Sequence, residues 1–289
     1  MLFRSKPILV TSAGQYGTLL TAIDLTIDAR AGRVVGKQAR QVIVQGAPFR
    51  SGGATVAQSK EHEVFLPDPQ VQGLVAKYSA AAAPLAGRPV GRITESINRR
   101  FAPSREHALG KLIADSQLEA TRSPEKGGAQ IAFMNPGGVR TDLNFTGDGT
   151  VTYSQLFGIL PFGNTLVVKT FTGAQIRLLL EQQFASGANT ASTPRVLLPS
   201  RGFSYAYDLR RPAGQRVGEI ALNGVPVDEA GRYRVVINDF LAEGGDNFSV
   251  LRQGEAATGA GHYVDALEAY FAVHSPVKPP LEQRIRRMD

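Results

Sequence analysis

The sequence is 289 residues long and 43% hydrophobic, which is ordinary for a soluble globular chain with one large domain or two modest ones. It contains no cysteine, which excludes disulfides, thiolate metal sites and cysteine nucleophiles. The 32 basic side chains exceed the 25 acidic ones, and this net charge of +7 favours anionic ligands. No basic helix, zinc-ligand spacing or aromatic RNA-binding strand accompanies the charge, so we expect no nucleic-acid partner.

No stretch of the sequence is apolar enough to cross a membrane. The longest candidate, residues 78–86, is alanine-rich and far shorter than the roughly 20 residues that a bilayer requires. Residues 1–12 begin with basic side chains but lack the apolar run and the small-residue cleavage site of a secretory signal peptide. We therefore expect either a protein that stays inside the cell or one whose true beginning lies upstream.

The N-terminal part of the chain predicts a hairpin and a connecting helix. Residues 20–28 and 34–44 have the alternating pattern of strands, and an Ala-Gly-Arg turn separates them. Residues 7–10 predict a further short, buried strand, and residues 50–63 form a polar, glycine-containing segment. Asp68 is placed to cap a helix whose apolar positions are Val71, Leu74, Val75 and Tyr78.

From Gly91 onward, strands and helices alternate. Ser104 follows a proline and is the expected N-cap of a helix that packs on a sheet through Leu109, Leu112, Ile113 and Ser116. Further strands are predicted over residues 131–134, 166–170, 203–208, 219–222 and 233–237, and further helices over residues 174–184 and 264–272.

Three loops carry residue types suited to ligand binding, and each follows a strand or opens a helix. In the first loop, Gly137 and Gly138 let a ligand approach the backbone, and Asn135 both donates and accepts hydrogen bonds. Arg140 offers a planar fork for a phosphate or carboxylate. The alternative interpretation is a tight turn followed by a surface arginine.

The second and third loops each place a phenylalanine among glycines and polar residues. Phe162 lies in residues 160–165 and Phe240 in residues 238–248. Two such rings are suited to form a slot for a flat base, because stacking contributes about 1–3 kcal/mol per base. Asp246 is then placed to accept hydrogen bonds from ribose hydroxyls. The alternatives are rings that belong to the core and a carboxylate that binds the N–H groups of its own turn.

Arg105 is a fourth candidate. In the first turn of a helix capped by Ser104, it would add charge to a helix end that already favours an anion. The competing interpretation is an exposed arginine that pairs with Glu106 or with solvent.

Taken in order, these segments resemble the signatures of the C-terminal domain of the 5'-nucleotidase family. The matching stretches are Asn135-Pro-Gly-Gly-Val-Arg140, Leu160-Pro-Phe-Gly-Asn164 and Asn238-Asp-Phe-Leu-Ala-Glu-Gly-Gly-Asp246, preceded by residues 105–115. The resemblance covers residues 68–289, and its specificity comes from the agreement of four motifs in one order. It implies an α+β fold in which a mixed sheet carries packed helices.

The resemblance also implies a domain organisation and a set of site residues. Residues 1–50 would be a C-terminal β remnant of a metallophosphoesterase domain, residues 51–88 a linker and hinge helix, and residues 89–289 the substrate-binding domain. By matching positions, Phe162 and Phe240 would sandwich the base, Asn135 and Asn164 would contact base or ribose, Asp246 would bind ribose, Arg105 and Arg140 would face the phosphate, and Gly137 and Gly138 would give backbone access. The sequence departs from the family's common residues at Ala108, Lys111 and Pro136.

The family's reaction is metal-assisted attack of water on a phosphate ester, with two divalent ions held in an N-terminal metallophosphoesterase domain. None of the four histidines, His62, His107, His262 and His274, lies in a His-x-His or Asp-x-His pair. Residues 7–43 are similar to the last strands of that domain. We therefore expect no catalytic residue, metal ligand or cofactor in this chain and no turnover by the chain alone, while the complete enzyme would use two divalent metal ions.

The leading hypothesis is the nucleotide-binding, substrate-specificity domain of a 5'-nucleotidase-type phosphohydrolase that acts on nucleoside 5'-phosphates in nucleotide catabolism. Family members are commonly periplasmic or secreted. One alternative is a non-catalytic module that senses or sequesters nucleotides. Another is a hydrolase of a different ester in the same superfamily, such as a nucleotide sugar, a cyclic nucleotide or a sulfur compound. Base preference, metal identity and oligomeric state stay open.

Overall fold

The computed structural model describes residues 2–3, 6–14, 16–51 and 54–289. The chain divides into two compact units, Met1–Ala80 and Ala81–Asp289, and helix α1 (Pro69–Ala86) spans the boundary between them. Among the described residues, no helix is both long enough and apolar enough to cross a membrane.

The first unit is built on a long antiparallel hairpin. Strand β3 (Leu19–Asp28) pairs with β4 (Arg33–Ile43) along its whole length, as the alternating pattern predicted. Two short hairpins join β1 (Leu2–Phe3) to β2 (Lys6–Pro7) and β5 (Phe49–Ser51) to β6 (Ala54–Val56). The strand predicted over residues 7–10 is wrong, because residues 8–10 have no partner strand among the described residues to complete a hydrogen-bonded ladder.

The expected cap of α1 is present. Asp68 Oδ1 accepts hydrogen bonds from the backbone N–H groups of Gln70 at 2.8 Å and Val71 at 3.1 Å. This geometry satisfies two of the free donors that every helix start leaves. No residue of α1 is buried.

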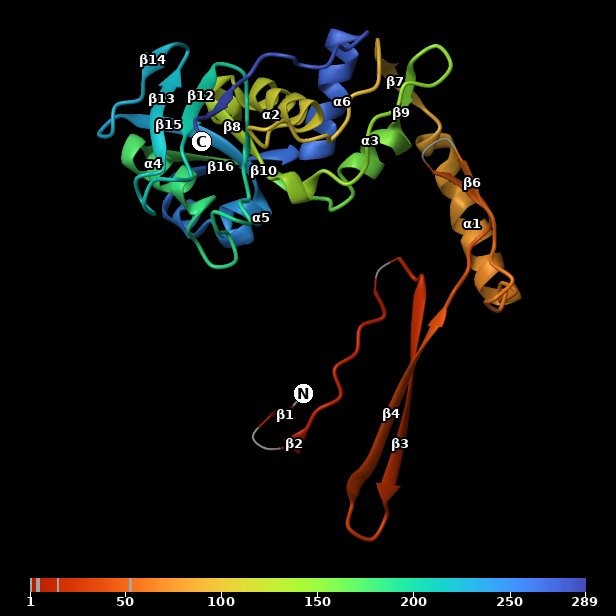
Figure 1. The fold of residues 1–289 in the computed structure, drawn as a ribbon. Helices are drawn as coiled ribbons and strands as arrows, with labels where there is room; N and C mark the ends of the chain where they lie inside the picture. Colours follow the sequence, from red (N-terminus) through yellow and green to blue (C-terminus); the bar gives the residue numbers. More distant parts are fainter. Residues whose placement is uncertain (1, 4–5, 15, 52–53) are drawn as a thin grey trace. The chain divides into compact units, whose positions relative to one another are not determined.

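The second unit contains a five-stranded sheet and a four-stranded sheet (Figure 1). The five-stranded sheet is mixed, since β8 and β15 are parallel and its other pairs are antiparallel. Its spatial order is β11 (Leu198–Pro199), β8 (Ile131–Met134), β15 (Arg232–Asn238), β10 (Thr165–Thr172) and β16 (Glu255–His262). The four-stranded sheet runs β14 (Val225–Pro226), β13 (Val217–Leu222), β12 (Phe203–Tyr207) and β17 (Ile285–Arg287). A separate pair joins β7 (Pro89–Arg92) to β9 (Thr150–Thr152).

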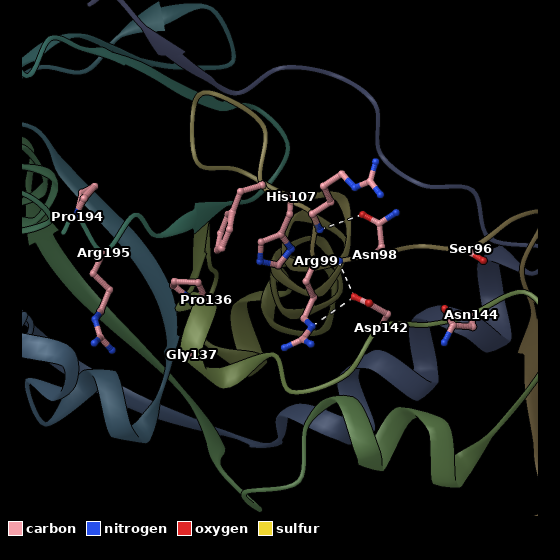
Figure 2. Close-up of a pocket in the computed structure, with 12 residues that line it drawn as sticks. Ser96, Asn98, Arg99, His107, Pro136, Gly137, Asp142, Asn144, Pro194 and Arg195 are labelled. Carbon is pink, nitrogen blue, oxygen red and sulfur yellow. Dashed lines mark hydrogen bonds and ion pairs between the residues drawn. The ribbon is translucent and has the colours of Figure 1, made fainter. Parts of the chain in front are cut away.

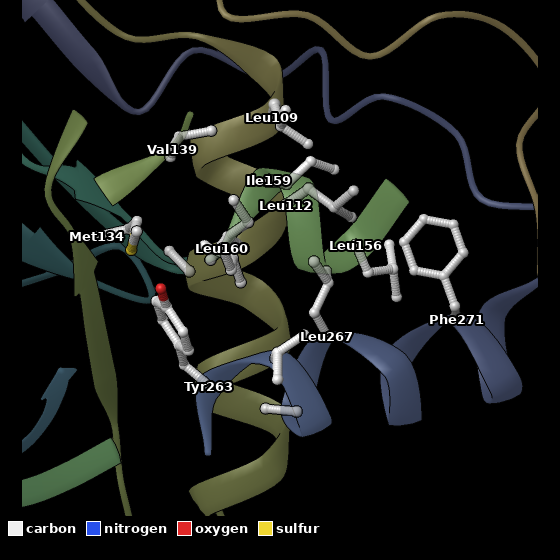
Figure 3. Packing of buried hydrophobic residues seen from close by; sticks show 14 of the residues in the cluster. Leu109, Leu112, Met134, Val139, Leu156, Ile159, Leu160, Tyr263, Leu267 and Phe271 are labelled. Atoms are coloured by element: carbon white, nitrogen blue, oxygen red, sulfur yellow. The ribbon is translucent and has the colours of Figure 1, made fainter. Parts of the chain in front are cut away.

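Both faces of the five-stranded sheet are buried. Along β8, Ala132 and Met134 belong to one core while Ile131 and Phe133 belong to the other, because successive side chains of a strand point to opposite faces. The first core, part of which Figure 3 shows, contains α2 (Ala108–Thr121), α3 (Tyr153–Ile159) and α6 (Tyr263–His274). The second core contains α4 (Gly173–Gln182), β12 and β13. The architecture is the α+β fold that the sequence predicted.

The helix predicted to follow Ser104 begins later. Helix α2 starts at Ala108 and its N-cap is His107, whose Nδ1 accepts a hydrogen bond from the Gly110 N–H at 3.0 Å. Ser104 Oγ donates instead to Glu106 Oε2 at 2.9 Å. Arg105 has a φ of 69°, a left-handed conformation that cannot continue a helix. The prediction that Arg105 lies in the first helical turn is therefore wrong.

Candidate functional site

The three loops singled out in the sequence meet at one end of the five-stranded sheet. Strands β8 and β15 are parallel, so the loops that follow them leave at the same end. Leu166, near the start of the antiparallel strand β10, lies opposite Asn238 at the end of β15. The loop before β10 therefore joins the other two, at the end where ligands of α/β sheets commonly bind.

These loops enclose a cavity of about 460 Å³, a volume in the range of small-molecule sites. All of the predicted site residues except Arg105 line it. The lining residues are Asn135, Gly137, Gly138, Arg140, Phe162, Asn164, Arg195, Asn238, Phe240, Asp246 and Tyr263.

The two phenylalanine rings of the cavity are solvent-accessible although their backbones are fixed. Phe162 is 57% exposed and Phe240 is 45% exposed. The Phe162 N–H donates to the Tyr263 hydroxyl at 3.1 Å, and burial raises the pKa of Tyr263, so the hydroxyl stays protonated. Asp239 Oδ1 accepts from the Phe240 N–H at 2.8 Å, and its Oδ2 accepts from the Thr165 N–H at 3.0 Å. One carboxylate thus ties the second and third loops together.

Arg140 lies against one of these rings. Its guanidinium carbon is 5.5 Å from the centroid of Phe162, within the range of a cation–π interaction. Its Nη1 donates to the Gly137 carbonyl oxygen at 3.1 Å, and both contacts keep the cation at the edge of the cavity. The remaining guanidinium N–H groups are suited to bind an anionic oxygen.

A chain of amides ends on Asp246. Asn238 Oδ1 accepts from the Leu241 N–H at 2.9 Å, and Asn238 Nδ2 donates to Asn135 Oδ1 at 3.0 Å. Asn135 Nδ2 then donates to Asp246 Oδ2 at 2.9 Å. The backbone donor at one end orients each amide in turn. The Asp246 side chain, which is 12% exposed, is therefore held by a side chain from the first loop rather than serving only its own turn.

Arg195 is a site residue that the sequence did not reveal. Its Nη1 lies 2.5 Å from Asp246 Oδ1, although the two residues are 51 positions apart. It belongs to a segment rich in threonine and serine with no recognisable binding motif. Asn238 and Tyr263 were also not singled out, although Asn238 opens the third motif and its position at the end of a strand was a usable signal.

Two glycines are required by the close packing behind the cavity. A Cβ at position 138 would lie 2.5 Å from Met134 Cε and 2.9 Å from Asn135 Oδ1. A Cβ at position 245 would lie 2.5 Å from the ring of Phe240. Position 137 differs, because its nearest neighbour would be 3.8 Å away. Because glycine has no Cβ, positions 138 and 245 leave room for the Asn135 side chain and the Phe240 ring beside the cavity.

Arg105 lies outside this cavity. It is exposed and occupies the left-handed backbone position between Ser104 and Glu106. The Glu106 carboxylate is buried and accepts hydrogen bonds from Ser104 Oγ and from the backbone N–H groups of Arg284 and Ile285. The alternative in which Arg105 pairs with Glu106 is therefore not observed either.

A second, larger cavity adjoins the first. It has a volume of about 950 Å³, and it shares Gly137 and Arg195 with the smaller cavity. Figure 2 shows Arg195 and Arg99 on either side of Pro136 in this cavity. Its lining residues are Ser96, Asn98, Arg99, Arg100, Phe101, His107, Pro136, Gly137, Asp142, Asn144, Pro194 and Arg195.

The histidines of the chain do not assemble a metal site within the described residues, where no group of three or more metal-ligating side chains occurs. His107 Nδ1 caps α2, His262 Nδ1 lies 3.2 Å from the Gly163 carbonyl oxygen, and His274 Nε2 lies 2.7 Å from Glu119 Oε1. The donor set that a two-metal phosphoesterase centre needs is thus not met by these residues.

Comparison with known proteins finds a matching family model and several similar proteins. The family model for the 5'-nucleotidase C-terminal domain matches residues 89–253. The chain is 28% identical over 294 residues to the trifunctional nucleotide phosphoesterase protein YfkN of Bacillus subtilis, covering 98% of this chain and 18% of that protein. It is 33% identical over 179 residues to the cell wall protein Lmo0130 of Listeria monocytogenes, covering 58% of this chain and 21% of that protein.

A solved structure matches almost the whole chain. The 5'-nucleotidase precursor from Thermus thermophilus superposes with a TM-score of 0.68 at 30% identity, over 98% of this chain and 52% of that one. The chain therefore spans about half the length, or less, of these proteins.

Proposed function

Since the chain belongs to the 5'-nucleotidase family through its C-terminal domain, we propose that residues 89–289 bind a nucleoside 5'-phosphate as the substrate-specificity domain of a phosphohydrolase. The observation that carries this proposal is the 460 Å³ cavity, which brings together residues from three motifs that are distant in the sequence. Its two accessible aromatic rings, its carboxylate and its arginine match the base, the ribose and the phosphate of a nucleotide, respectively.

Each part of the ligand has a chemically suited partner. A base stacks on Phe162 and Phe240. Stacking on an aromatic ring does not depend on which base is bound, because every base has a flat π-face. Ribose hydroxyls donate to Asp246, which Asn135 and Arg195 hold in place. Asn164 contacts the base or the ribose, and Arg140 binds the phosphate together with the backbone at Gly137 and Gly138. Arg105 is exposed and does not line the cavity, so we assign it no contact with the ligand here.

We assign hydrolysis to the complete protein. Two divalent metal ions in an N-terminal metallophosphoesterase domain would activate water for attack on the phosphate ester. On this proposal, residues 1–50 belong to that domain, residues 51–88 form the linker, and α1 is the hinge that carries bound nucleotide toward the metals. This chain's own role is to bind and orient the nucleotide.

We also propose a place and a pathway for the complete protein. Its substrates are nucleoside phosphates released during nucleotide catabolism, and it acts outside the cytoplasm, in the periplasm or at the cell surface. The relative described as a cell wall protein and the solved nucleotidase precursor support this location.

Isothermal titration of the chain with adenosine and AMP, without metal, tests the proposal. Two stacked faces and a ribose carboxylate are expected to supply about 4–7 kcal/mol, which corresponds to dissociation constants from about 1 mM to about 10 µM. Saturable binding with AMP tighter than adenosine is the expected result. No heat with either ligand at millimolar concentration would contradict it.

A turnover assay tests whether the chain hydrolyses AMP by itself. With added Mn²⁺ or Zn²⁺, the chain is expected to bind AMP but not to release phosphate. Turnover above the level of a mock purification would show that the chain itself carries a metal centre. Binding that survives both Phe162→Ala and Phe240→Ala would favour a different ester as the ligand.

A further inference from the structure

Arg195 stands between the two adjoining cavities. It lines the smaller cavity, where the nucleoside is proposed to bind, and it also lines the larger polar cavity of about 950 Å³. Its guanidinium touches Asp246, the proposed ribose ligand. A group attached to the ribose at Asp246 would therefore lie next to a residue that also lines the larger cavity.

We infer that the larger cavity is a second anion subsite, which receives a phosphoryl group carried on the 2' or 3' oxygen of the bound nucleoside. The ligand class that fits both cavities is a ribonucleoside bisphosphate, with one phosphate at the 5' oxygen and one on the opposite ribose edge. This inference rests on the proposed function, because it takes the ribose to lie at Asp246.

The charge of the larger cavity favours an anion. Three arginines line it, Arg99, Arg100 and Arg195, against a single carboxylate, Asp142. Asp142 Oδ1 is engaged by Arg99, whose backbone N–H donates at 2.8 Å and whose Nε donates at 3.3 Å. The Arg100 side chain is exposed and makes no hydrogen bond or ion pair within the described residues. One guanidinium is thus available to an incoming phosphate.

Most N–H groups of the Arg195 guanidinium are not hydrogen-bonded within the described residues. Only its Nη1 is bonded, to Asp246, and within the described part of the chain Nε and Nη2 have no partner. The side chain is 42% exposed. A guanidinium presents five N–H groups in a fixed plane, so it can bind a carboxylate on one edge and a phosphate on another. The ribose carboxylate and the proposed phosphate are therefore compatible, and the ion pair with Asp246 does not have to break.

His107 adds an uncharged ring to the wall of the same cavity. Its Nδ1 accepts the Gly110 N–H, so the proton of the neutral ring resides on Nε2. Burial, with the charge of Arg99 close by, lowers the pKa of His107 to about 4, so the ring is uncharged at neutral pH. His107 lines the cavity but is only 3% exposed, so its neutral ring leaves the arginines as the charged groups that face an anion there.

The test compares dissociation constants for adenosine, AMP and adenosine 3',5'-bisphosphate, measured by titration calorimetry. The bisphosphate is expected to bind about tenfold more tightly than AMP, the effect of one or two charge-assisted hydrogen bonds. In Arg195→Gln and Arg100→Gln that ratio is expected to fall to about twofold or less. The ratio cancels effects on the base and the 5'-phosphate, which both ligands share. Arg100 makes no contact with Asp246, so a lower ratio in Arg100→Gln reports the phosphate contact without a change at the ribose carboxylate.

A matched substitution controls for net charge and folding. Arg232→Gln removes an exposed arginine that pairs with Glu255 and lines neither cavity, so its ratio should match that of the unmodified chain. Equal affinity for AMP and the bisphosphate would overturn the inference, as would a gain that persists in both cavity variants. Absence of saturable binding by adenosine, which carries no phosphate, would overturn the proposed function and the inference with it.

Discussion

Arg195 Nη1 lies 2.5 Å from Asp246 Oδ1, and Asn135 Nδ2 lies 2.9 Å from the other oxygen of the same carboxylate. Both oxygens are thus fixed by donors from separate loops, and each keeps lone pairs for a ligand. Asp246 also has a left-handed φ of 55°, a conformation that costs free energy unless its surroundings hold it. The structure presents this carboxylate at a fixed point of the cavity wall.

Asp246→Asn is expected to weaken adenosine binding by about 10- to 100-fold, because hydrogen bonds to a charged acceptor contribute about 1.5–3 kcal/mol. Titration calorimetry measures the change. Asp24→Asn, at an exposed position of β3 in the other unit, is the matched control and should leave the affinity within twofold. If Asp246→Asn also leaves the adenosine affinity within twofold, Asp246 does not bind the ribose.

Each of Phe162→Ala and Phe240→Ala is expected to cost about 1–3 kcal/mol of adenosine binding, as stacking on one base face does. Phe157→Ala is the comparison, since Phe157 is 48% exposed on α3 and lines neither cavity. If all three variants bind adenosine equally well, the rings at 162 and 240 do not form the base slot.

Gly138→Ala and Gly137→Ala are neighbouring substitutions with opposite expected outcomes. The Cβ at 138 would clash with Met134 and Asn135, so we expect a loss of about 1–3 kcal/mol in the free energy of unfolding. The Cβ at 137 meets nothing closer than 3.8 Å, and a change within about 0.5 kcal/mol is expected. Urea denaturation of both variants is the measurement, and equal stabilities would show that the turn relaxes around the added methyl group.

His107 is expected to make stability depend on pH. Burial lowers its pKa from 6.5 to about 4 in the folded state. Between these two pH values the unfolded chain binds the proton more strongly, so stability falls as the pH drops from about 6.5 to about 4. The full loss is on the order of 3 kcal/mol. Above pH 6.5 both states hold a neutral ring and this contribution does not change.

His107→Asn isolates that effect, because asparagine also caps a helix but has no proton to gain in this range. Urea denaturation at several pH values between 4 and 7 should give a shallower pH dependence for the variant than for the unmodified chain. Parallel curves would mean that the ring is not protonated on unfolding over this range.

Glu106→Gln is expected to destabilise the second unit by about 2–4 kcal/mol. The carboxylate is 3% exposed and accepts from Ser104 Oγ and from two backbone N–H groups, while Lys111 Nζ lies 3.5 Å away. The NH₂ group of glutamine would face the hydroxyl and N–H groups that now donate to the carboxylate, and at least one of these hydrogen bonds would be lost. Glu219→Gln, whose side chain is 91% exposed, should change the free energy of unfolding by less than about 0.5 kcal/mol. Equal effects of the two substitutions would contradict the structural role of Glu106.

The sequence predicted those parts of the fold that depend on local pattern. Residues 131–134 read as one apolar run, and they form β8, which is buried on both faces. The glycine, asparagine and phenylalanine residues of the loops could be recognised because their types and order form a motif. The sheet then brings these loops together at one end. The sequence indicated this arrangement only indirectly, through the alternation of strands and helices along the chain.

Other parts depend on contacts that sequence pattern does not encode. Strand β16 reads Glu-Ala-Ala-Thr-Gly-Ala-Gly-His, which has no apolar alternation, and its position follows from pairing with β10. The start of α2 was misplaced because Ser104 is a good capping residue that is bonded instead to Glu106. Arg195 was missed because its partner lies 51 residues away and its own surroundings carry no motif.

The anchoring of Glu106 by residues 284 and 285 has a consequence for biosynthesis. These hydrogen bonds close a loop of 178 residues, and the parallel strand β17 completes the four-stranded sheet at the same place. A chain emerging from the ribosome therefore exposes Glu106 long before the segment that supplies its backbone donors has been translated. A pause in translation before residue 284 would leave the unit with the Glu106 carboxylate still lacking its backbone donors.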